Sequence, residues 1–282
     1  MGAEEPGRSE VPGDPGLNLN IDETARNKWH KVLVEGHESL RRAHKVFRHL
    51  PGPPRCKLCH NPFGGVGGRI VGIAGFKPSR KNPNLCSRCC DDLPAGGLEV
   101  DIAVLFADLR ESTALAEQVG PVAFASLLNR FYRISTGVLI AHDAIIDKLI
   151  GDEVMALFIP GITGSAYRRE AATAAIELLT ALAAEPSLHV GVAVDAGVAY
   201  VGNVGSDGVV DFTALGDPVN TAARLQAQAF AGELVLADHL YEEVADLLPD
   251  AEARAVTVRG RQLPIDIHVA RIVPVEPGAS LN

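Results

Sequence analysis

Hydrophobic positions between residues 98 and 272 change repeatedly from a period of two to a helical period, which predicts strands alternating with helices. Runs of β-branched and aromatic residues predict strands near 99–107, 144–159 (a hairpin), 188–195, 198–214, 233–236, 254–259 and 264–271. Helical spacing predicts helices near 112–141, 165–184, 217–229 and 239–246. Helices that alternate with a mostly antiparallel sheet indicate an α+β fold.

The residues before this region follow a different pattern. Residues 1–22 are rich in Pro, Gly and acidic residues without apolar periodicity, which predicts a disordered tail, and residues 273–282 form a short C-terminal tail. Within residues 23–53, apolar side chains recur at spacings of seven, three, four and three: Leu33, Leu40, Ala43, Phe47 and Leu50. This spacing predicts an amphipathic basic helix, with a break allowed at Gly36. The helix would either pack on its own domain or pair with a second copy.

All five cysteines lie in residues 54–97, which we interpret as a cysteine-rich module and its linker. Two Cys-x2-Cys pairs have a spacing that lets four thiolates share one metal site: Cys56, Cys59, Cys86 and Cys89. Cys90 follows Cys89 and His60 follows Cys59 in the sequence, so each could serve as an additional metal ligand. Three interpretations stay open, namely a structural zinc ion, an iron–sulfur cluster and free thiols. The glycine-rich run 63–68 lacks the Lys-Ser/Thr ending of a P-loop and predicts a flexible segment.

Carboxylates stand where two of the predicted strands end. Asp108 follows the apolar run 100–106, and Asp152 belongs to the two-residue turn of the predicted hairpin. If the two strands are neighbours, the carboxylates converge, and paired carboxylates with nucleotide phosphates are a common way to hold Mg²⁺ or Mn²⁺. A helix cap at Asp108 and a simple turn at Asp152 would explain the same residues without a metal.

A third segment adds an amide and a guanidinium. A predicted helix that begins at Asp217 carries Asn220 and Arg224, which are four residues apart and share a face. A glycine hairpin is expected at residues 197–205. Together these separated motifs occur in an order that resembles the catalytic domain of class III adenylate and guanylate cyclases, over residues 98–272. The resemblance implies a ferredoxin-like α+β cyclase domain behind the N-terminal helix and cysteine-rich module.

The resemblance also implies a reaction. A ribose 3′-oxygen attacks the α-phosphorus of a nucleoside triphosphate and expels pyrophosphate, with two Mg²⁺ or Mn²⁺ ions in each active site. Asp108 and Asp152 match the family's metal ligands. Arg224 matches the residue that stabilises negative charge in the transition state, and Asn220 matches the residue that orients the ribose.

Two further positions match the residues that read the base. Lys148 can donate to adenine N1 but cannot accept from the N1 and N2 donors of guanine, which favours ATP. Thr213 stands where many relatives have Asp, and its hydroxyl can accept from the adenine amino group or donate, so some GTP use is expected. Arg261 stands where the family usually has a Lys that binds the triphosphate. The expected activity is therefore that of an adenylate cyclase.

The resemblance implies a head-to-tail homodimer in which both chains contribute to each active site. One chain would supply Asp108, Asp152 and Arg261, and its partner would supply Lys148, Thr213, Asn220 and Arg224. A catalytically silent nucleotide-binding module is the alternative, but neither a carboxylate nor the Arg is missing. A diguanylate cyclase is excluded because its Gly-Gly-Asp/Glu-Glu-Phe signature is absent.

Composition and charge refine this picture. The chain has 282 residues and 47% hydrophobic content, no apolar run long enough for a membrane span, and no signal-peptide pattern at residues 1–6, so we expect a cytoplasmic protein. Residues 24–90 carry fourteen Lys and Arg against two acids, whereas residues 91–282 carry eleven against twenty-seven. The basic segment could dock on its acidic neighbour or bind an anionic partner. No recognised nucleic-acid motif accompanies it, so nucleic-acid binding is not expected.

Overall fold

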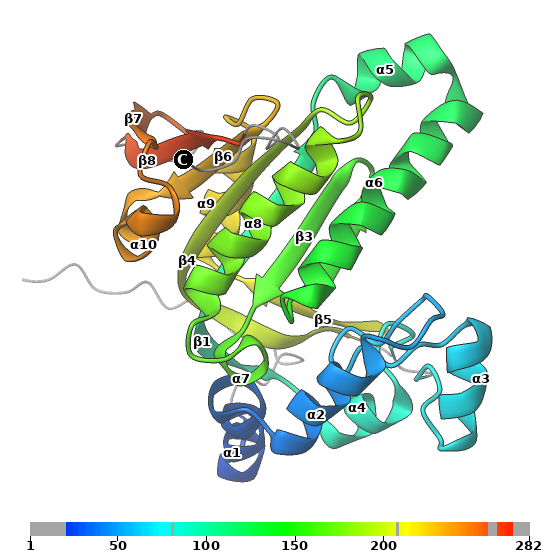
Figure 1. Cartoon of the computed structure of the whole chain (residues 1–282). Coiled ribbons are helices and arrows are strands. Elements are labelled where there is room, and N and C mark those ends of the chain that lie inside the picture. Colours follow the sequence, from blue (N-terminus) through cyan, green and yellow to red (C-terminus); the bar gives the residue numbers. More distant parts are fainter. Residues whose placement is uncertain (1–20, 80–81, 207–208, 259–263, 273–282) are drawn as a thin grey trace, which may run out of the picture.

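The computed structural model describes most of the chain (Figure 1). The described residues are 21–79, 82–206, 209–258 and 264–272. The two predicted tails lie outside them, except that Ile21 packs against the core and Asp22 caps the first helix by accepting from the Ala25 N–H at 2.6 Å. Arg261 also lies outside the described residues.

Within the described residues, one eight-stranded sheet organises the chain from β1 onward. Its strands are β1 Gly97–Leu109, β2 Ile145–Ile150, β3 Glu153–Phe158, β4 Val190–Ser206, β5 Val209–Leu215, β6 Glu233–Ala237, β7 Glu252–Val256 and β8 Ile265–Arg271. The spatial order is β2-β3-β1-β4-β6-β8-β7, and β5 pairs with the second half of β4. Only the β4–β6 pair of these is parallel. The mostly antiparallel α+β prediction is confirmed.

Helices flank this sheet and form most of the N-terminal segment. Those that follow β1 are α5 Ser112–Val119, α6 Pro121–Ala141, α7 Pro160–Thr163, α8 Tyr167–Ala183, α9 Asp217–Gln226 and α10 Asp238–Val244. Those that precede it are α1 Glu23–His30, α2 Glu38–Phe47, α3 Gly65–Ile73 and α4 Ser87–Asp92. Two short turns of other helix types complete the set, a π turn at Lys31–Glu35 and a 3₁₀ turn at Ala245–Leu247.

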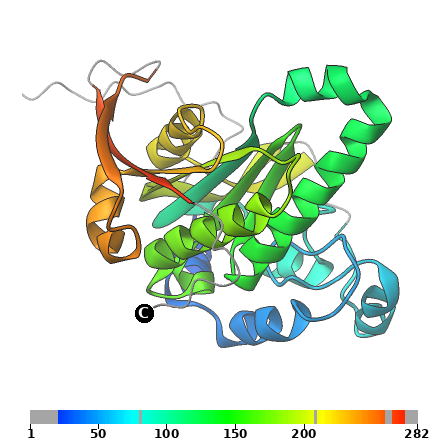
Figure 2. The same ribbon diagram turned by 45° about the horizontal axis from the view of Figure 1, so that its top comes forward.

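The two faces of β1 belong to two different cores. Alternate residues such as Leu105 pack in a core with α6 and α8, and Figure 2 shows these two green helices over the same face of the sheet. The intervening residues, such as Val104, pack in a second core that includes α9 and the N-terminal segment. Trp29 and Leu33 are fully buried in that second core. The N-terminal helix therefore packs on its own chain.

The predicted N-terminal helix is interrupted where the sequence allows a break. α1 and its π turn end at Gly36, whose φ of +79° suits glycine, and α2 begins two residues later. Basic side chains of the segment then contact the cyclase-like region: Arg41 donates to the Gly161 carbonyl at 3.3 Å, and Arg48 lies 3.4 Å from Asp143. The basic segment docks on its acidic neighbour. No helix among the described residues is long and apolar enough to cross a membrane.

Two predictions from glycine content are wrong. The strands predicted at 188–195 and 198–214 are divided differently in the structure: β4 continues from Val190 to Ser206, and β5 is a separate strand that begins at Val209. The glycines of segment 197–205 permit close strand contact rather than a turn. A Cβ on Gly202 would overlap the Gly97 backbone of β1. Similarly, most of the run 63–68, expected to be flexible, lies in α3.

The glycines of α3 have a packing role of their own. A Cβ on Gly67 would overlap the Pro51 carbonyl oxygen, and one on Gly64, which precedes the helix, would overlap the Pro53 carbonyl oxygen. These glycines let the start of α3 pack directly on the backbone of the proline-rich turn. Small side chains here therefore serve close backbone packing rather than chain flexibility.

Candidate active site and cysteine cluster

Asp108 and Asp152 lie together at one end of the sheet. Asp108 is opposite Glu153 in the β1–β3 register, and Asp152 belongs to the two-residue turn that joins β2 to β3. Gly151, the other turn residue, has a φ of +61°, as such hairpin turns require. The Leu109 N–H donates to the Asp152 carbonyl at 3.2 Å and ties the two strand ends together. The predicted convergence of the two segments is therefore present in one chain.

The electrostatics of this strand end favour a cation. Burial raises the pKa of Asp108 to about 6, a rise that the Arg110 guanidinium opposes and the Asp152 charge reinforces. Burial and the same two carboxylates raise the pKa of Glu153. Arg110 forms an ion pair with Asp108. Carboxylates that destabilise one another's charge fit a site for Mg²⁺ or Mn²⁺, since a divalent ion would remove that cost.

Lys148 and Thr213 are in direct contact. The Lys148 Nζ donates to the Thr213 Oγ1 at 2.6 Å, so β2 and β5 bring the two predicted base-reading residues together. Asp147 completes the group, because its Oδ2 accepts from Thr213 Oγ1 at 2.6 Å and from Lys148 Nζ at 3.2 Å. The Asp147 side chain is fully buried. The structure thus assembles a three-residue polar group.

A β-bulge explains how two successive residues reach Thr213. The β2–β3 register shifts between Ile146 and Lys148, which leaves Asp147 as the extra residue. In a regular strand, Asp147 and Lys148 would point to opposite faces of the sheet. Alternation in the sequence therefore gives no reason to group them, and Asp147 was not predicted as a site residue.

Asn220 and Arg224 lie on α9, one turn apart as predicted. The Asn220 side chain is exposed and Arg224 is half-buried. α9 buries its other face, including Ala222 and Leu225, against the sheet. Among the described residues, no side-chain hydrogen bond or ion pair is found for Asn220 or Arg224, which leaves their polar groups available for a ligand within this part of the chain.

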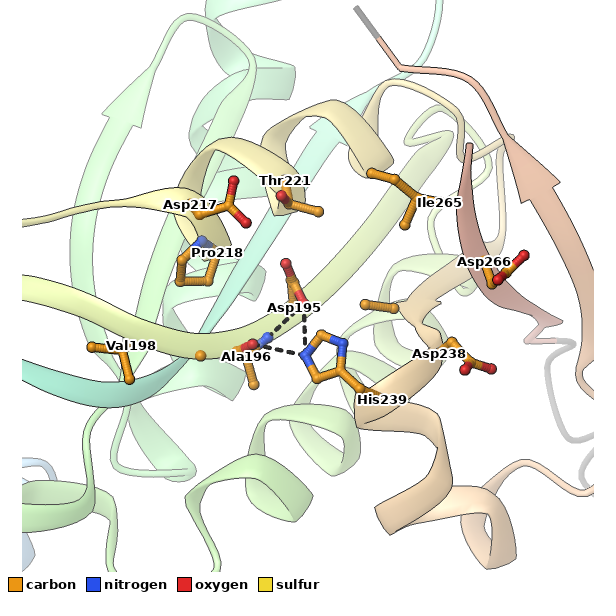
Figure 3. Close-up of a pocket in the computed structure, with 12 residues that line it drawn as sticks. Asp195, Ala196, Val198, Asp217, Pro218, Thr221, Asp238, His239, Ile265 and Asp266 are labelled. Atoms are coloured by element: carbon orange, nitrogen blue, oxygen red, sulfur yellow. Dashed lines mark hydrogen bonds and ion pairs between the residues drawn. The ribbon is translucent and has the colours of Figure 1, made fainter. Parts of the chain in front are cut away.

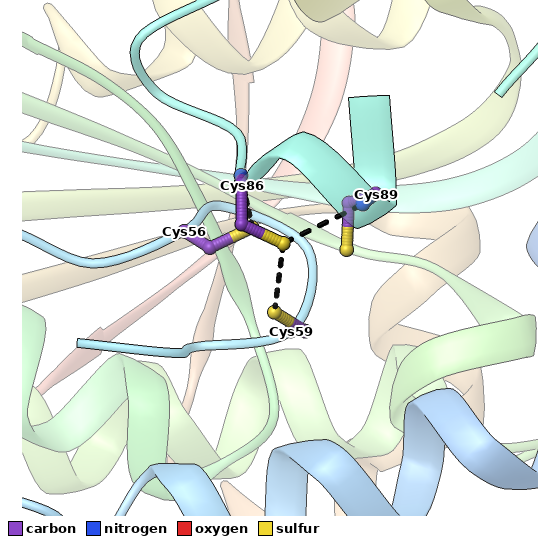
Figure 4. Close-up of side chains that lie close together, drawn as sticks. All are labelled: Cys56, Cys59, Cys86 and Cys89. Atoms are coloured by element: carbon purple, nitrogen blue, oxygen red, sulfur yellow. Dashed lines mark hydrogen bonds between the residues drawn. The ribbon is translucent and has the colours of Figure 1, made fainter. Parts of the chain in front are cut away.

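The four cysteines of the two Cys-x2-Cys pairs form a tight cluster (Figure 4). Their Sγ atoms all lie within 4.8 Å of one another, and those of Cys59 and Cys86 are 3.7 Å apart. Tetrahedral zinc with Zn–S bonds of about 2.3 Å requires sulfur separations of about 3.8 Å. The hydrogen bond with Cys56 raises the pKa of Cys59 and lowers that of Cys86. These four sulfur atoms are close enough together to bind one metal ion as thiolates.

The spare ligands named from the sequence are not part of this cluster. The His60 Nε2 lies 3.2 Å from the Ala144 carbonyl oxygen, and its ring packs against the tilted His44 ring with centroids 3.9 Å apart. Burial lowers the pKa of His60 well below its usual value, so the ring is neutral. Its role is to join the cysteine-rich module to the start of β2.

Lys57 links the cysteine cluster to the base-reading group. It lies between Cys56 and Cys59 in the sequence, and its Nζ is 3.3 Å from Asp147 Oδ1 and 2.9 Å from Asp211 Oδ1. Its side chain is only 9% exposed. A cavity of about 870 Å³ lies here between the module, α6 and β2, and its lining includes Lys57, Asp147 and Lys148. Sequence reasoning missed Lys57, since nothing in a Cys-x2-Cys segment indicates which side chain will face a distant strand.

A family model described as the adenylate and guanylate cyclase catalytic domain matches residues 98–266. The chain belongs to this family. Among curated relatives, the uncharacterized protein Rv1319c of Mycobacterium tuberculosis is 35% identical over 166 residues, which are 58% of this chain and 28% of that protein. Rv1320c of the same organism, also uncharacterized, is 30% identical over 208 residues, 72% of this chain and 34% of that protein. The chain thus spans about a third of the length of each of these relatives.

Solved structures of both kinds of cyclase resemble this one. The adenylyl cyclase CyaB from P. aeruginosa has a TM-score of 0.55 and 25% identity, covering 65% of this chain and 98% of that one. The guanylyl cyclase Cya2 has a TM-score of 0.58 at 23% identity, covering 66% and 98%, which shows the shared fold. These neighbours share the class III cyclase fold and include both adenylyl and guanylyl cyclases.

A second cavity of about 500 Å³ lies beside α9 and α10 (Figure 3). Its lining includes four aspartates and His239, whose Nε2 is 2.8 Å from the Ala196 carbonyl oxygen and 3.2 Å from Asp195 Oδ1. The aspartates are Asp195, Asp217, Asp238 and Asp266. None of the cyclase residues assigned above lines the described part of this cavity, and we assign it no role in the reaction.

Proposed function

We propose that this cyclase is an adenylate cyclase that converts ATP to 3′,5′-cyclic AMP and pyrophosphate. The observation that carries the choice of ATP is the 2.6 Å contact between Lys148 and Thr213. The Lys148 ammonium donates to adenine N1, and Thr213 accepts from the adenine 6-amino group. Guanine offers a donor at N1 where Lys148 also presents donors, and so it fits this pair poorly.

The catalytic residues divide the remaining tasks. Asp108 and Asp152 would hold two Mg²⁺ or Mn²⁺ ions, which neutralise phosphate charge and lower the pKa of the 3′-hydroxyl. Arg224 donates to the α-phosphate as negative charge develops there, and Asn220 orients the ribose. The lack of side-chain partners for these two residues within the described part of the chain supports that assignment. Arg261 would bind the triphosphate.

The active form is proposed to be a homodimer with two shared sites. Asp108 and Asp152 of one chain would act with Lys148, Thr213, Asn220 and Arg224 of its partner. Two-fold symmetry then creates two equivalent sites. The family's architecture supports this arrangement.

The cysteine cluster is proposed to bind one zinc ion. Its sulfur separations suit a single tetrahedral ion. In a four-iron cluster each thiolate binds its own iron, which holds the sulfurs farther apart than around one ion. Because Leu58 and Cys56 belong to the second core together with residues of β1, the zinc site would help to order that core. A regulatory role for the module is part of the proposal.

The test is incubation of the purified protein with ATP or GTP and Mn²⁺ or Mg²⁺, followed by separation of cyclic nucleotides and a pyrophosphate assay. We expect cyclic AMP to be the main product, with a kcat/KM for ATP at least about tenfold above the kcat/KM for GTP. Cyclic GMP as the main product would overturn the choice of ATP. A protein that binds ATP and forms neither product would instead be the silent nucleotide-binding module.

A further inference from the structure

The buried carboxylate of Asp147 has no role in the reaction described above. Its side chain is fully buried and lies between two ammonium groups, with Lys57 at 3.3 Å from Oδ1 and Lys148 at 3.2 Å from Oδ2. A buried charge is strongly unfavourable unless it is paired and hydrogen-bonded. Lys57 is the more buried of the two lysines, and its Nζ is also 3.3 Å from the Phe212 carbonyl oxygen. The Lys57–Asp147 pair is therefore a fixed feature of this region.

This pair determines where the Thr213 proton points. A hydroxyl has one proton and two lone pairs, and an ionised carboxylate can only accept. Thr213 Oγ1 lies 2.6 Å from Asp147 Oδ2 and 2.6 Å from Lys148 Nζ, and an ammonium can only donate. Thr213 therefore donates its single proton to Asp147 and accepts from Lys148. The one position left on its oxygen is a lone pair.

We propose that Asp147 and Lys57 are specificity-determining positioning residues for the base. Asp147 engages the Thr213 proton, so Thr213 can only accept from the base, and Lys57 holds Asp147 in place. This inference rests on the proposed role of Lys148 and Thr213 in reading adenine. The adenine 6-amino group donates to the Thr213 lone pair, whereas the O6 of guanine would oppose it with a lone pair of its own.

Lys57 also connects the cysteine cluster to base selection, because the cluster positions the backbone of this lysine. It is the neighbour of Cys56 in the chain, and its backbone N–H donates to the Asn84 carbonyl at 2.8 Å, two residues before Cys86. The Lys57 backbone is therefore held on one side by its peptide bond to Cys56 and on the other by a hydrogen bond to a residue close to Cys86. A cluster that loses its order releases Lys57 from Asp147, and base discrimination should weaken with it.

The main test is Asp147→Ala, with Asp211→Asn as the matched control. Asp211 contacts the same Lys57 at 2.9 Å, but no contact joins it to Thr213 among the described side chains. Dissociation constants for fluorescent, non-cyclising analogues of ATP and GTP are measured for each protein, together with kcat and KM. Asp147→Ala frees the Thr213 proton for guanine O6, and we expect the preference for ATP over GTP to fall about tenfold. Asp211→Asn should keep the wild-type preference.

Lys57→Met is the second variant, with the exposed Lys77→Met as its control. Without Lys57, Lys148 is the one cation paired with Asp147 among the described side chains, and it is drawn toward that carboxylate. We expect KM and the dissociation constant for ATP to rise about tenfold, with kcat changed less. If Asp147→Ala does not fold, Lys57→Met still tests whether the Lys57–Asp147 pair positions the base-reading residues. Zinc content and thermal unfolding show whether each variant is folded.

The two proposals fail separately. A wild-type protein that binds ATP over GTP but forms no cyclic nucleotide contradicts the proposed activity, and the binding constants still test Asp147 and Lys57. A wild-type protein without base preference contradicts the inference. So does an unchanged preference in folded Asp147→Ala, or an unchanged ATP affinity in Lys57→Met.

Discussion

At the scale of single residues, Asp108 shows how the strand end is adapted to a cation. Its carboxylate is partly buried beside Asp152 and Glu153, and the Arg110 guanidinium opposes the rise in its pKa. Removing one of several like charges lowers the cost of the metal-free state, whereas it removes a metal ligand from the loaded one. The same substitution should therefore have opposite effects on stability and activity.

We predict that Asp108→Ala lowers kcat by at least about a hundredfold, the order of magnitude that metal catalysis contributes. The metal-free protein should keep its fold and unfold at an equal or slightly higher temperature in EDTA. Cyclic nucleotide production and thermal unfolding measure the two effects. Activity above about a hundredth of wild type would remove Asp108 from the set of metal ligands.

The sequence identifies residues whose type and local spacing carry the chemistry. Lys148 and Thr213 were predicted as a pair through the family resemblance, and the structure brings them into contact. Lys57 and Asp147 were missed for two physical reasons. The β-bulge at Asp147 breaks the alternation on which strand reasoning depends, and the contact between Lys57 and Asp147 joins residues 90 positions apart.

At the scale of elements, His142 joins two helices through charge. It follows the C-terminus of α6, with Nδ1 at 2.6 Å from Glu170 and Nε2 at 2.7 Å from Glu177, both on α8. Burial disfavours the protonated ring, but hydrogen bonds with Glu177 and Glu170 outweigh it and raise the pKa of His142. A raised pKa means that the folded protein binds the proton more tightly than the unfolded chain.

The ion pairs of His142 contribute fully to stability below the pKa of the histidine in the unfolded chain, about 6.5. Their contribution is lost as pH rises through the higher pKa of His142 in the folded protein. We predict that His142→Gln lowers the free energy of unfolding by about 1 kcal/mol at pH 6, and by less as pH rises toward 9. Urea unfolding across this pH range tests it, with the exposed His189→Gln as control. Equal losses at both ends of the range would contradict the charged pairing.

The cysteine cluster is the element-scale test of the module. We predict one zinc ion per chain, lost in Cys56→Ser together with protection of residues 54–92 in hydrogen exchange. Cys90→Ser is the control, since Cys90 lies outside the four-sulfur cluster. Elemental analysis after anaerobic purification gives the metal. If the protein contains neither zinc nor iron, the proposed metal site is wrong. If it contains iron instead of zinc, the site is present but the proposed metal is wrong.

Most elements could be predicted because their apolar periods are long and regular. The hairpin of β2 and β3 and the helices α5, α6, α8, α9 and α10 follow the predicted pattern closely, whereas the short α7 was not predicted. The glycine segments could not be predicted in this way. A glycine in a sequence is compatible with a turn or with a close backbone contact, and the segment packed against it determines which one occurs. Here the Gly97 backbone packs closely on Gly202, and the Pro51 backbone packs closely on Gly67.

At the scale of the whole molecule, one core joins the N-terminal segment to the cyclase fold. Trp29 and Leu33 are buried with Cys56 and Cys86 against β1, and Trp29 stacks on Phe212 at a centroid distance of 6.2 Å. Phe212 precedes Thr213 on β5. The module and the base-reading group therefore share a core, and a change in the module should reach the site without a moving hinge.

The central claim is an adenylate cyclase whose sites are shared between two chains. The most direct test mixes Asp108→Ala protein with Arg224→Ala protein under conditions in which subunits demonstrably exchange. Each variant alone should be inactive, because both of its sites lack one essential group. About half of the mixed population should be heterodimers with one intact site of two, so cyclic AMP production should recover to roughly a quarter of wild type. No recovery after proven exchange would contradict the shared-site account.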